Sequence, residues 1–230
     1  MLAKLQKILS ASETKKTFFK RIERLYSKYS KEYRFIERAY DDAEEAFRDK
    51  NREGGDEYFT HLRAVALILI DYLYIFERID LKIPAYQVIA AALLHDVIED
   101  CPKWTLERIF RDYNEAVALL LDYVSKRPKT EFASIEEQRK FYHDRFVNAP
   151  FEFFLLKLPD RLHNQMTLWC CDKEKISFKI YETKEYYIPW AKKLGILAHE
   201  LEETVILLEN NLEEYFNGLL AAQKTNGEKK

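Results

Sequence analysis

The chain has 230 residues, of which 47% are hydrophobic, and its formal net charge is −2. This length fits one large domain or two small ones, and the apolar content is enough for a sizeable core. Only 5 Gly and 6 Pro leave few turns for a many-stranded β fold, and the interspersed charges do not resemble a nucleic-acid-binding surface. No apolar stretch reaches the roughly 20 residues of a membrane span, and the N-terminus lacks signal-peptide features. Cys101, Cys170 and Cys171 match neither a disulfide framework nor zinc spacing, so we expect free thiols in a cytoplasmic protein.

Helical periodicity predicts an all-α protein. Apolar residues recur every three or four positions over residues 14–48, and the polar, Gly-containing stretch 51–57 is the clearest loop. Thr60 is the expected N-cap of the next helix, over 60–77, and Pro84 stands at the start of the one after it. The remaining helices are predicted over 105–114, 116–123, 136–147, 151–169, 175–194 and 199–222, with Thr105 as a cap and Asn114 as a left-handed stop. Residues 151–158 could also form a buried strand, but a lone strand would have no pairing partner.

An almost wholly apolar run ends in a pair of ionisable residues. Residues 88–94 are only Val, Ile, Ala and Leu, and His95 and Asp96 follow directly. Because an unpaired charge is costly to desolvate, the two residues need a partner, and a divalent metal would satisfy both. A buried His–Asp hydrogen bond is the alternative. By contrast, His143 and His199 stand among charged residues and are expected to be solvated.

With His61 upstream and Asp160 downstream, the order H, HD, D resembles the metal-ligand order of HD-type phosphohydrolases. This resemblance extends the pair to a candidate set of four ligands from three separate helices. Two imidazoles and two carboxylates that leave a position for water suit Mn²⁺ or another transition ion better than a closed zinc site. Glu99 and Asp100 follow the pair by one helical turn, so they are expected on the same face. Carboxylates in this position would orient and deprotonate the attacking water of a hydrolysis. His61 could instead be structural.

Asp160 also begins a polar helical face. Asn164 and Thr167 follow it at four and seven residues, which predicts a wall of hydrogen-bonding groups beside the metal. His163 is expected to orient its neighbours by hydrogen bonding. The other face is expected to enter the core through Leu162, Met166 and Trp169.

Four sequence blocks resemble the hydrolase domain of RelA/SpoT homologue proteins. They are residues 58–61 (YFTH), 90–100 (AAALLHDVIED), 122–126 (DYVSK) and 157–168 (KLPDRLHNQMTL), and a fifth block over 182–196 agrees with them. The resemblance implies a single-domain, HD-type helical bundle. Its expected parts are N-terminal helices packed on the core (1–50), the hydrolase core (51–205), a C-terminal helix (206–222) and a disordered tail (223–230). Because the chain ends near residue 230, it resembles the stand-alone small alarmone hydrolases, which lack a synthetase domain.

The resemblance also implies an activity and its residues. Members of the family use Mn²⁺ to remove the 3′-diphosphate of ppGpp or pppGpp, which yields GDP or GTP and pyrophosphate. One ion would be held by His61, His95, Asp96 and Asp160, with Glu99 and Asp100 as the catalytic acids. Substrate contacts fall on Arg52 near the guanine, on Asn164, Thr167 and Tyr187 near the ribose and 3′ side, and on Lys126, which could instead be an ordinary surface lysine. The expected partner is a small nucleotide, with no nucleic acid or membrane and with homo-oligomerisation left open.

Several positions depart from the family pattern. Pro159 replaces a usual Ala inside a predicted helix, where it would remove a hydrogen bond and favour a kink before Asp160. Glu53 replaces a frequent Lys and Glu57 a usual Pro, which weakens the expected attraction to phosphates, and Cys101 replaces a common Thr. Two alternatives therefore remain: a broader HD phosphohydrolase acting on adenosine alarmones or NADPH, and a non-catalytic alarmone sensor. The intact Glu99 and Asp100 argue against the sensor.

Overall fold

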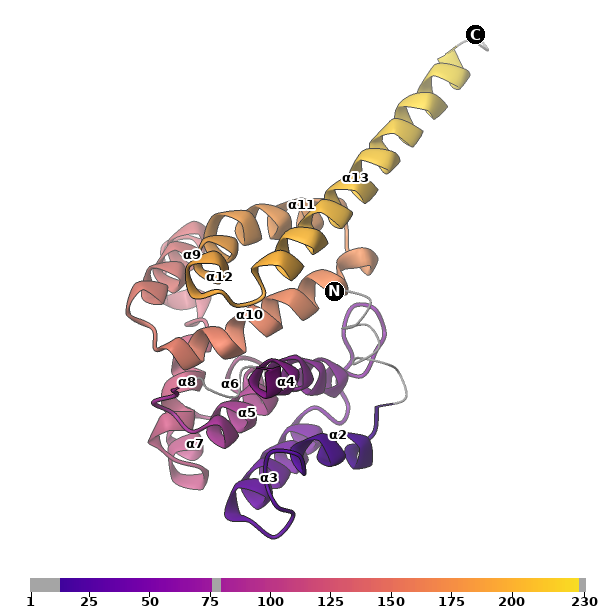
Figure 1. The fold of residues 1–230 in the computed structure, drawn as a ribbon. Coiled ribbons are helices and arrows are strands. Elements are labelled where there is room, and N and C mark those ends of the chain that lie inside the picture. The colour runs from indigo at the N-terminus through magenta and orange to yellow at the C-terminus, as the bar shows by residue number, and fades with distance from the viewer. Residues whose placement is uncertain (1–12, 76–79, 228–230) are drawn as a thin grey trace.

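The computed structural model describes residues 13–75 and 80–227 and confirms the all-α prediction (Figure 1). The helices are α2 (Lys15–Ile22), α3 (Lys31–Ala46), α4 (Tyr58–Ile75), α5 (Ala85–Leu94), α6 (Val97–Asp100), α7 (Leu106–Asp112), α8 (Glu115–Val124), α9 (Ile135–Asp144), α10 (Phe151–Met166), α11 (Lys173–Glu182), α12 (Ile188–Leu194) and α13 (Ala198–Gly227). Three short 3₁₀ turns, η1 (Lys129–Glu131), η2 (Arg145–Asn148) and η3 (Leu168–Cys170), and a π-helical segment, η4 (Thr183–Tyr187), connect them. Within the described ranges, the β pairing consists of an isolated bridge between Asn51 and Glu57.

The helix α5 forms the centre of the bundle. Its residues 87–94 are all buried, because α3, α4, α8 and α10 pack around it. In Figure 1, α4 and α5 lie between the α2–α3 pair and the group formed by α9 to α13. A helix that is apolar on every side is expected in this position, and its burial fixes the end that carries the His-Asp pair.

The N-terminal apolar pattern corresponds to two helices. The predicted region 14–48 is interrupted between Ile22 and Lys31, and each helix begins with its own cap, since Thr14 and Ser30 accept hydrogen bonds from backbone N–H groups of the first turn. The two helices bury one face each against the core, and residue 47 closes the second one. The spacing of apolar residues identified this buried face, but it did not reveal the turn that reverses the chain.

Two predicted caps are wrong. Thr60 lies inside α4, which begins at Tyr58, and its hydroxyl donates to the carbonyl of Glu57. Asn114 is extended, with φ −178°, and its side chain accepts from the N–H of Val117, so it caps the start of α8. In both cases the polar side chain satisfies a backbone group beside it, Thr60 within the first turn of its helix and Asn114 at the start of the next helix. The Thr105 cap of α7 is confirmed.

The helix α10 carries one side of the site and continues through Pro159. It forms a single helix from Phe151 to Met166, and residues 152–162 are all buried. The strand alternative for 151–158 is therefore wrong, and no helix break precedes Asp160. Packing on both faces holds the helix together although the proline removes one of its hydrogen bonds.

The C-terminal half ends in a long helix. The predicted segment 175–194 comprises α11, the π-helical segment η4 and α12, and Gly195 adopts the left-handed conformation that ends α12, with φ 69°. The helix α13 extends away from the body in Figure 1 and reaches Gly227, beyond the predicted start of a disordered tail at residue 223. Ala221 and Ala222 favour helix, whereas Thr225, Asn226 and Gly227 do not, so helix propensity alone does not set the end of this helix. Residues 228–230 and the predicted end of the helix 60–77 lie outside the described residues.

A search for membrane-spanning segments across the described helices finds none that combines the required length with the required apolar character.

Candidate active site

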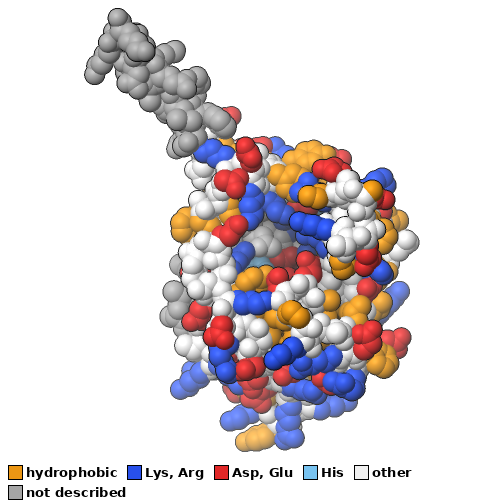
Figure 2. Space-filling view, turned by 180° about the vertical axis from the view of Figure 1, so that it is seen from behind, with side chains coloured by type: hydrophobic (Ala, Val, Ile, Leu, Met, Phe, Trp, Pro, Cys, Tyr) orange, Lys and Arg blue, Asp and Glu red, His pale blue; other side chains and the backbone are white. Residues whose placement is uncertain are grey.

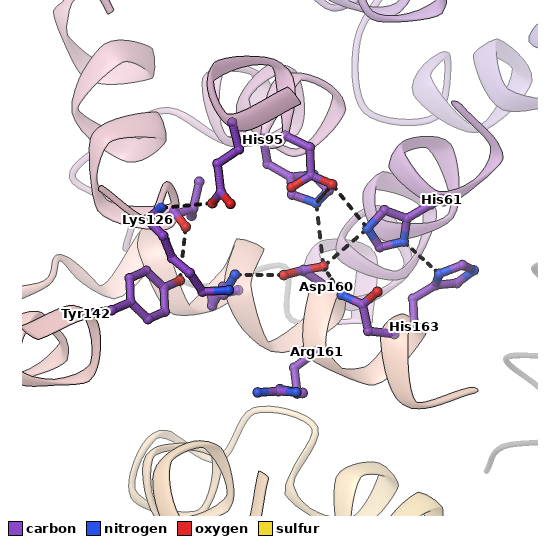
Figure 3. A network of polar contacts seen from close by, with 12 residues as sticks. His61, His95, Lys126, Tyr142, Asp160, Arg161 and His163 are labelled. Atoms are coloured by element: carbon purple, nitrogen blue, oxygen red, sulfur yellow. Dashed lines mark hydrogen bonds and ion pairs between the residues drawn. The ribbon is translucent and has the colours of Figure 1, made fainter. Parts of the chain in front are cut away.

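The four predicted metal ligands lie close together, and Figure 3 shows three of them, His61, His95 and Asp160, in one network of polar contacts. His61 comes from α4, His95 and Asp96 from the junction between α5 and α6, and Asp160 from α10. His61 Nε2 lies 3.2 Å from Asp160 Oδ1 and 3.7 Å from Asp96 Oδ2. His95 Nε2 lies 3.3 Å from Asp96 Oδ2 and 3.5 Å from Asp160 Oδ1. Asp96 and Asp160 thus each approach both imidazole Nε2 atoms, and the ligand atoms of His61, His95 and Asp96 lie within 4.8 Å of one another.

The periodicity predicted that the His-Asp pair would lie inside a continuous helix, but the helix is interrupted at this pair. The helix α5 ends at Leu94, His95 is its C-cap and Asp96 is the N-cap of α6. The N–H of Asp100 still donates to the carbonyl of Asp96, at 3.0 Å, so the chain turns in a nearly helical way. Because the helix is interrupted here, the side chains of His95 and Asp96 can both face the other ligands. The two acids, Glu99 and Asp100, then follow on α6.

Hydrogen bonds fix the tautomers of both histidines. His95 Nδ1 lies 2.8 Å from the carbonyl of Ala92, which can only accept, so Nδ1 carries a proton and Nε2 is the atom left to take up a second proton or a metal ion. His163 Nδ1 contacts Arg52 Nη1 at 3.4 Å and His61 Nδ1 at 2.8 Å. Since Arg52 can only donate, His163 Nδ1 accepts and His61 Nδ1 donates to it, which leaves His61 Nε2 unprotonated. Both free nitrogens therefore face the carboxylates, and the prediction that His163 orients its neighbours agrees with this arrangement.

The electrostatics of the cluster suit a cation. His95 Nε2 is buried and has no hydrogen-bond partner among the described residues. Burial alone would lower the pKa of His95, but Asp96 and Asp160 outweigh it and raise that pKa to about 9. Burial alone would raise the pKa of Asp160, but the charge of Lys157 and the neighbouring histidines hold that pKa well below its usual range. A site that draws a proton onto a buried imidazole will also attract a metal ion, so the donor set fits one.

The two predicted catalytic acids lie beside the ligands with different partners. Glu99 Oε1 accepts from the backbone N–H of Lys126 at 2.8 Å, and burial raises the pKa of Glu99 above its usual value. Asp100 Oδ2 lies 2.8 Å from the hydroxyl of Tyr58, which also lies 2.9 Å from Asp96 Oδ2. Tyr58 thus bridges a ligand and an acid. Sequence analysis missed this role, although Tyr58 stands three residues before His61, on the same helical face.

A cavity of about 490 Å³ opens beside the cluster. Figure 2 shows the hollow, with Lys and Arg side chains around its rim and acidic and His side chains at its floor. All five predicted substrate residues line it: Arg52, Lys126, Asn164, Thr167 and Tyr187. Arg52 donates from Nη2 to Asn164 Oδ1 at 2.7 Å and from Nη1 to Thr167 Oγ1 at 3.1 Å, so three of the five are already joined.

Further cations at the cavity were not predicted. Lys157, Arg161, Lys175 and Lys179 also line it. Lys157 is buried and donates to Asp160 Oδ2 at 2.9 Å, directly behind the metal ligands. These residues lie on α10 and α11, which follow one another in the chain, and the packing of the two helices brings their charges to one cavity. A pocket with this many cations is suited to a polyanion such as a polyphosphate.

Two predictions about side-chain burial are wrong. His143 is buried, because its ring stacks on Tyr186 with centroids 3.8 Å apart and its Nε2 lies 3.5 Å from Glu182 Oε1. Trp169 is 72% exposed and lines the cavity, whereas Leu162 enters the core as predicted. The helix α10 ends at Met166, so helical periodicity no longer applies at Trp169.

A buried ion cluster supports the wall of the cavity. Glu182 Oε2 pairs with Arg161 and also accepts from Lys179 Nζ at 2.9 Å. Burial alone would raise the pKa of Glu182, but these cations outweigh it and hold the pKa well below 4.5. The Arg161 guanidinium lies 4.0 Å from the centre of the Tyr187 ring, so the cluster also fixes a predicted substrate contact.

We expect Glu182→Gln to lower the free energy of unfolding by about 3 kcal/mol or more, because it leaves a buried guanidinium without its carboxylate. The depressed pKa keeps Glu182 ionised, so its contribution is complete above about pH 4.5 and is lost as acidification protonates it. Denaturant unfolding at pH 7 and at decreasing pH measures both effects. Glu209→Gln is the matched control, since its pair with Lys184 is exposed and should contribute less than about 1 kcal/mol. Equal losses in the two variants would contradict the prediction.

Comparison with known proteins identifies the family. The profile of the HD-domain family matches residues 39–197, which contain all the metal-ligand candidates. This chain belongs to the HD-domain family. The HD domain is 39% identical over 175 residues to a GTP pyrophosphokinase of Streptomyces coelicolor, and 36% identical over 187 residues to a guanosine-3′,5′-bis(diphosphate) 3′-pyrophosphohydrolase of Aquifex aeolicus. These alignments cover 74% and 79% of this chain but only 19% and 25% of the relatives, so the chain spans about a quarter of their length or less.

Two further matches agree. The bifunctional (p)ppGpp synthase/hydrolase SpoT of Escherichia coli is 35% identical over 173 residues, which cover 73% of this chain and 23% of that protein. A solved structure, described as a metazoan ortholog of SpoT that hydrolyzes ppGpp, superimposes with a TM-score of 0.52 over 80% of this chain and 94% of its own. At 23% identity, that likeness concerns the fold. The resemblance to RelA/SpoT homologues is confirmed by these relatives.

Proposed function

We propose that this HD domain hydrolyses the 3′-diphosphate of guanosine alarmones, converting ppGpp or pppGpp with water to GDP or GTP and pyrophosphate. The observation that carries the proposal is the convergence of His61, His95, Asp96 and Asp160 beside a cavity lined with cations. Relatives named as ppGpp 3′-pyrophosphohydrolases, matched over about three quarters of this chain, support the choice of substrate. The setting would be the cytoplasm.

We assign one Mn²⁺ ion to the two Nε2 atoms and the two carboxylates. Imidazole and carboxylate together suit a transition ion, and the protonated Nδ1 atoms leave Nε2 as the donor. When bound, the ion would lower the pKa of a water molecule and neutralise charge on the phosphate. The other contributions come from the side chains of the protein.

Glu99 would accept the proton of the attacking water. Desolvation at the cavity raises its pKa, and its Oε1 accepts from the backbone N–H of Lys126. The water oxygen forms a bond to the phosphorus attached to the ribose 3′-oxygen, and the bond between that phosphorus and the 3′-oxygen breaks. The 3′-oxygen leaves with the proton that Glu99 took from the water, while Tyr58, which contacts both Asp96 and Asp100, holds Asp96 in position.

The cations of the cavity have a separate task. Lys126, which follows α8, and Lys157, Arg161 and Lys179 of α10 and α11 line the cavity, where they would attract the diphosphate groups. Burial and the neighbouring Arg161 lower the pKa of Lys179 to about 8, so it remains largely charged at neutral pH. Arg52, Asn164, Thr167 and Tyr187 would hold the nucleoside.

A single assay tests the proposal. Purified protein with Mn²⁺ is incubated with ppGpp, pppGpp, an adenosine alarmone and NADPH, and the products are resolved by ion exchange. We expect the fastest reaction with a guanosine alarmone, with pyrophosphate as a product. Release of single phosphates, or a preference for NADPH, would replace the proposal by a broader phosphohydrolase, and binding without turnover would replace it by a sensor.

A further inference from the structure

An exposed tryptophan lies at the mouth of the cavity. Trp169 is the middle residue of η3, and its neighbour Leu168 is buried and anchors the turn at the end of α10. The Trp169 side chain is nevertheless 72% exposed and lines the cavity. Indole is among the largest apolar surfaces a side chain offers, and aromatic rings at nucleotide sites commonly stack on bases. The described residues contain other exposed aromatic side chains, such as Tyr181, but these do not line the cavity.

The loop that carries Arg52 packs against the same turn. Glu53 Oε2 accepts from Cys171 Sγ at 3.0 Å and from Lys175 Nζ at 2.5 Å. A Cβ atom at Gly54 would lie 3.4 Å from Cys170 Sγ, so loop and turn are in van der Waals reach. Glu53 is thereby fixed next to the turn of Trp169, and the hydrogen bonds of Lys175 and Cys171 lower its pKa, which keeps it a carboxylate.

This pair of side chains matches the chemistry of guanine. Guanine presents N–H donors at N1 and at its 2-amino group, and one ionised carboxylate can accept from both. Adenine has an acceptor at N1 and no 2-amino group, so the same carboxylate would face a lone pair. A site built to accept hydrogen bonds discriminates strongly against a ligand that lacks the donors.

The position along the cavity is also consistent with a bound nucleotide. Arg52, next to Glu53, donates to Asn164 and Thr167, which follow the ligand Asp160 along α10. The loop, these two polar residues and the metal ligands therefore follow one another along one wall. A base held at the mouth would direct its ribose and phosphates inward, toward Asp160.

We propose that Trp169 and Glu53 form a base subsite in which the indole stacks on the ring and the carboxylate selects guanine over adenine. The subsite rests on the proposed function for its nucleotide ligand. The subsite also gives a role to Glu53, which replaces a frequent Lys of the family. Because Glu53 is paired with Lys175, its carboxylate would bind the base and would not repel the phosphates. The wild-type protein is expected to prefer a guanine nucleotide about tenfold or more.

Binding without turnover tests the subsite. GDP, IDP and ADP are titrated into the full chain in EDTA, with calorimetry and tryptophan fluorescence as the readouts, since none of them carries a 3′-diphosphate to be hydrolysed. We expect affinity in the order GDP, IDP, ADP, because inosine keeps N1–H but lacks the 2-amino group. Glu53→Ala should weaken GDP about tenfold and leave ADP nearly unchanged. Trp169→Ala should weaken GDP and ADP alike, by about five- to a hundredfold, and Trp169→Phe should restore most of the loss.

Two controls separate this role from others. Lys175→Met breaks the same ion pair but keeps the carboxylate, so it should retain the preference for GDP, and Tyr181→Ala removes an exposed aromatic ring outside the cavity. An unchanged GDP-to-ADP ratio in Glu53→Ala, undiminished binding in Trp169→Ala, or a wild-type protein that binds neither nucleotide would overturn the subsite. A protein that prefers GDP in this way but leaves ppGpp intact would overturn the proposed function and keep the subsite.

Discussion

Asp96→Ala is expected to lose its metal and, with it, hydrolysis of ppGpp. Asp96 Oδ2 lies 3.3 Å from His95 Nε2 and 3.7 Å from His61 Nε2, so the carboxylate faces both nitrogen donors. Loss of an outer partner of a metal ligand typically weakens the metal about 10- to 100-fold, and loss of a ligand should cost more than this. We expect Mn²⁺ affinity to fall more than about 100-fold and turnover to fall to background.

Metal content after dialysis, measured by mass spectrometry, and ppGpp turnover test this expectation together. The control is Asp144→Ala, which removes an exposed acid paired with Lys140 and should change neither quantity. The backbone N–H of Asp100 donates to the backbone of Asp96, so circular dichroism should show an intact fold in the variant. Full metal occupancy in Asp96→Ala would show that Asp96 is not a ligand.

Much of the site could be predicted from the sequence because its ligands stand in buried segments. His95 and Asp96 end a run of apolar residues, and an ionisable pair in that position needs a partner whatever the tertiary structure. The family resemblance added His61 and Asp160, and the structure brings all four side chains together. Their contacts with one another depend on the packing of α4, α5 and α10, which periodicity alone does not specify.

The residues that sequence analysis missed owe their roles to tertiary contacts. Lys157, Arg161 and Glu182 are charged residues, which are rarely buried, and each is compensated by a partner from another part of the chain or the next turn. His143 stands among polar residues in the sequence, yet its ring is covered by Tyr186 of the π-helical segment. Helical spacing identifies buried faces within one helix but not pairs between helices.

The ends of helices were the other source of error. Trp169 was expected to face the core because helical spacing was continued past Met166, where the chain turns into η3. Thr60 was placed before its helix although it lies in the first turn, and Asn114 was assigned to the end of one helix although it caps the start of the next. A polar residue near a boundary can satisfy either of two backbone groups, so the sequence alone does not decide between them.

Glu99→Gln should retain the metal and lose the rate, by about 10²- to 10⁴-fold in kcat, because it removes the group that takes the proton of water. Glu99 is not among the side chains that contact the histidine nitrogens, so its amide should leave the ligand set intact. Burial raises the pKa of Glu99, with Lys126 and Lys157 opposing the shift. A base must be deprotonated to act, so the wild-type rate should fall on the acid side at a pH above 4.5, the usual value for this carboxyl group.

The decisive measurements are metal content, kcat and its pH profile in the same preparations. Glu99→Gln should bind Mn²⁺ as the wild type does. Its kcat should not show the fall at acid pH that protonation of Glu99 produces in the wild type. Asp100→Asn serves as the comparison, because Asp100 bonds to Tyr58 and reaches the metal ligands only through it. Asp100→Asn should therefore still show the fall in kcat at acid pH that protonation of Glu99 causes. Its kcat should decrease less than that of Glu99→Gln. A Glu99→Gln variant with wild-type kcat would transfer the base role to another group, and equal metal loss in both variants would make the two acids ligands instead.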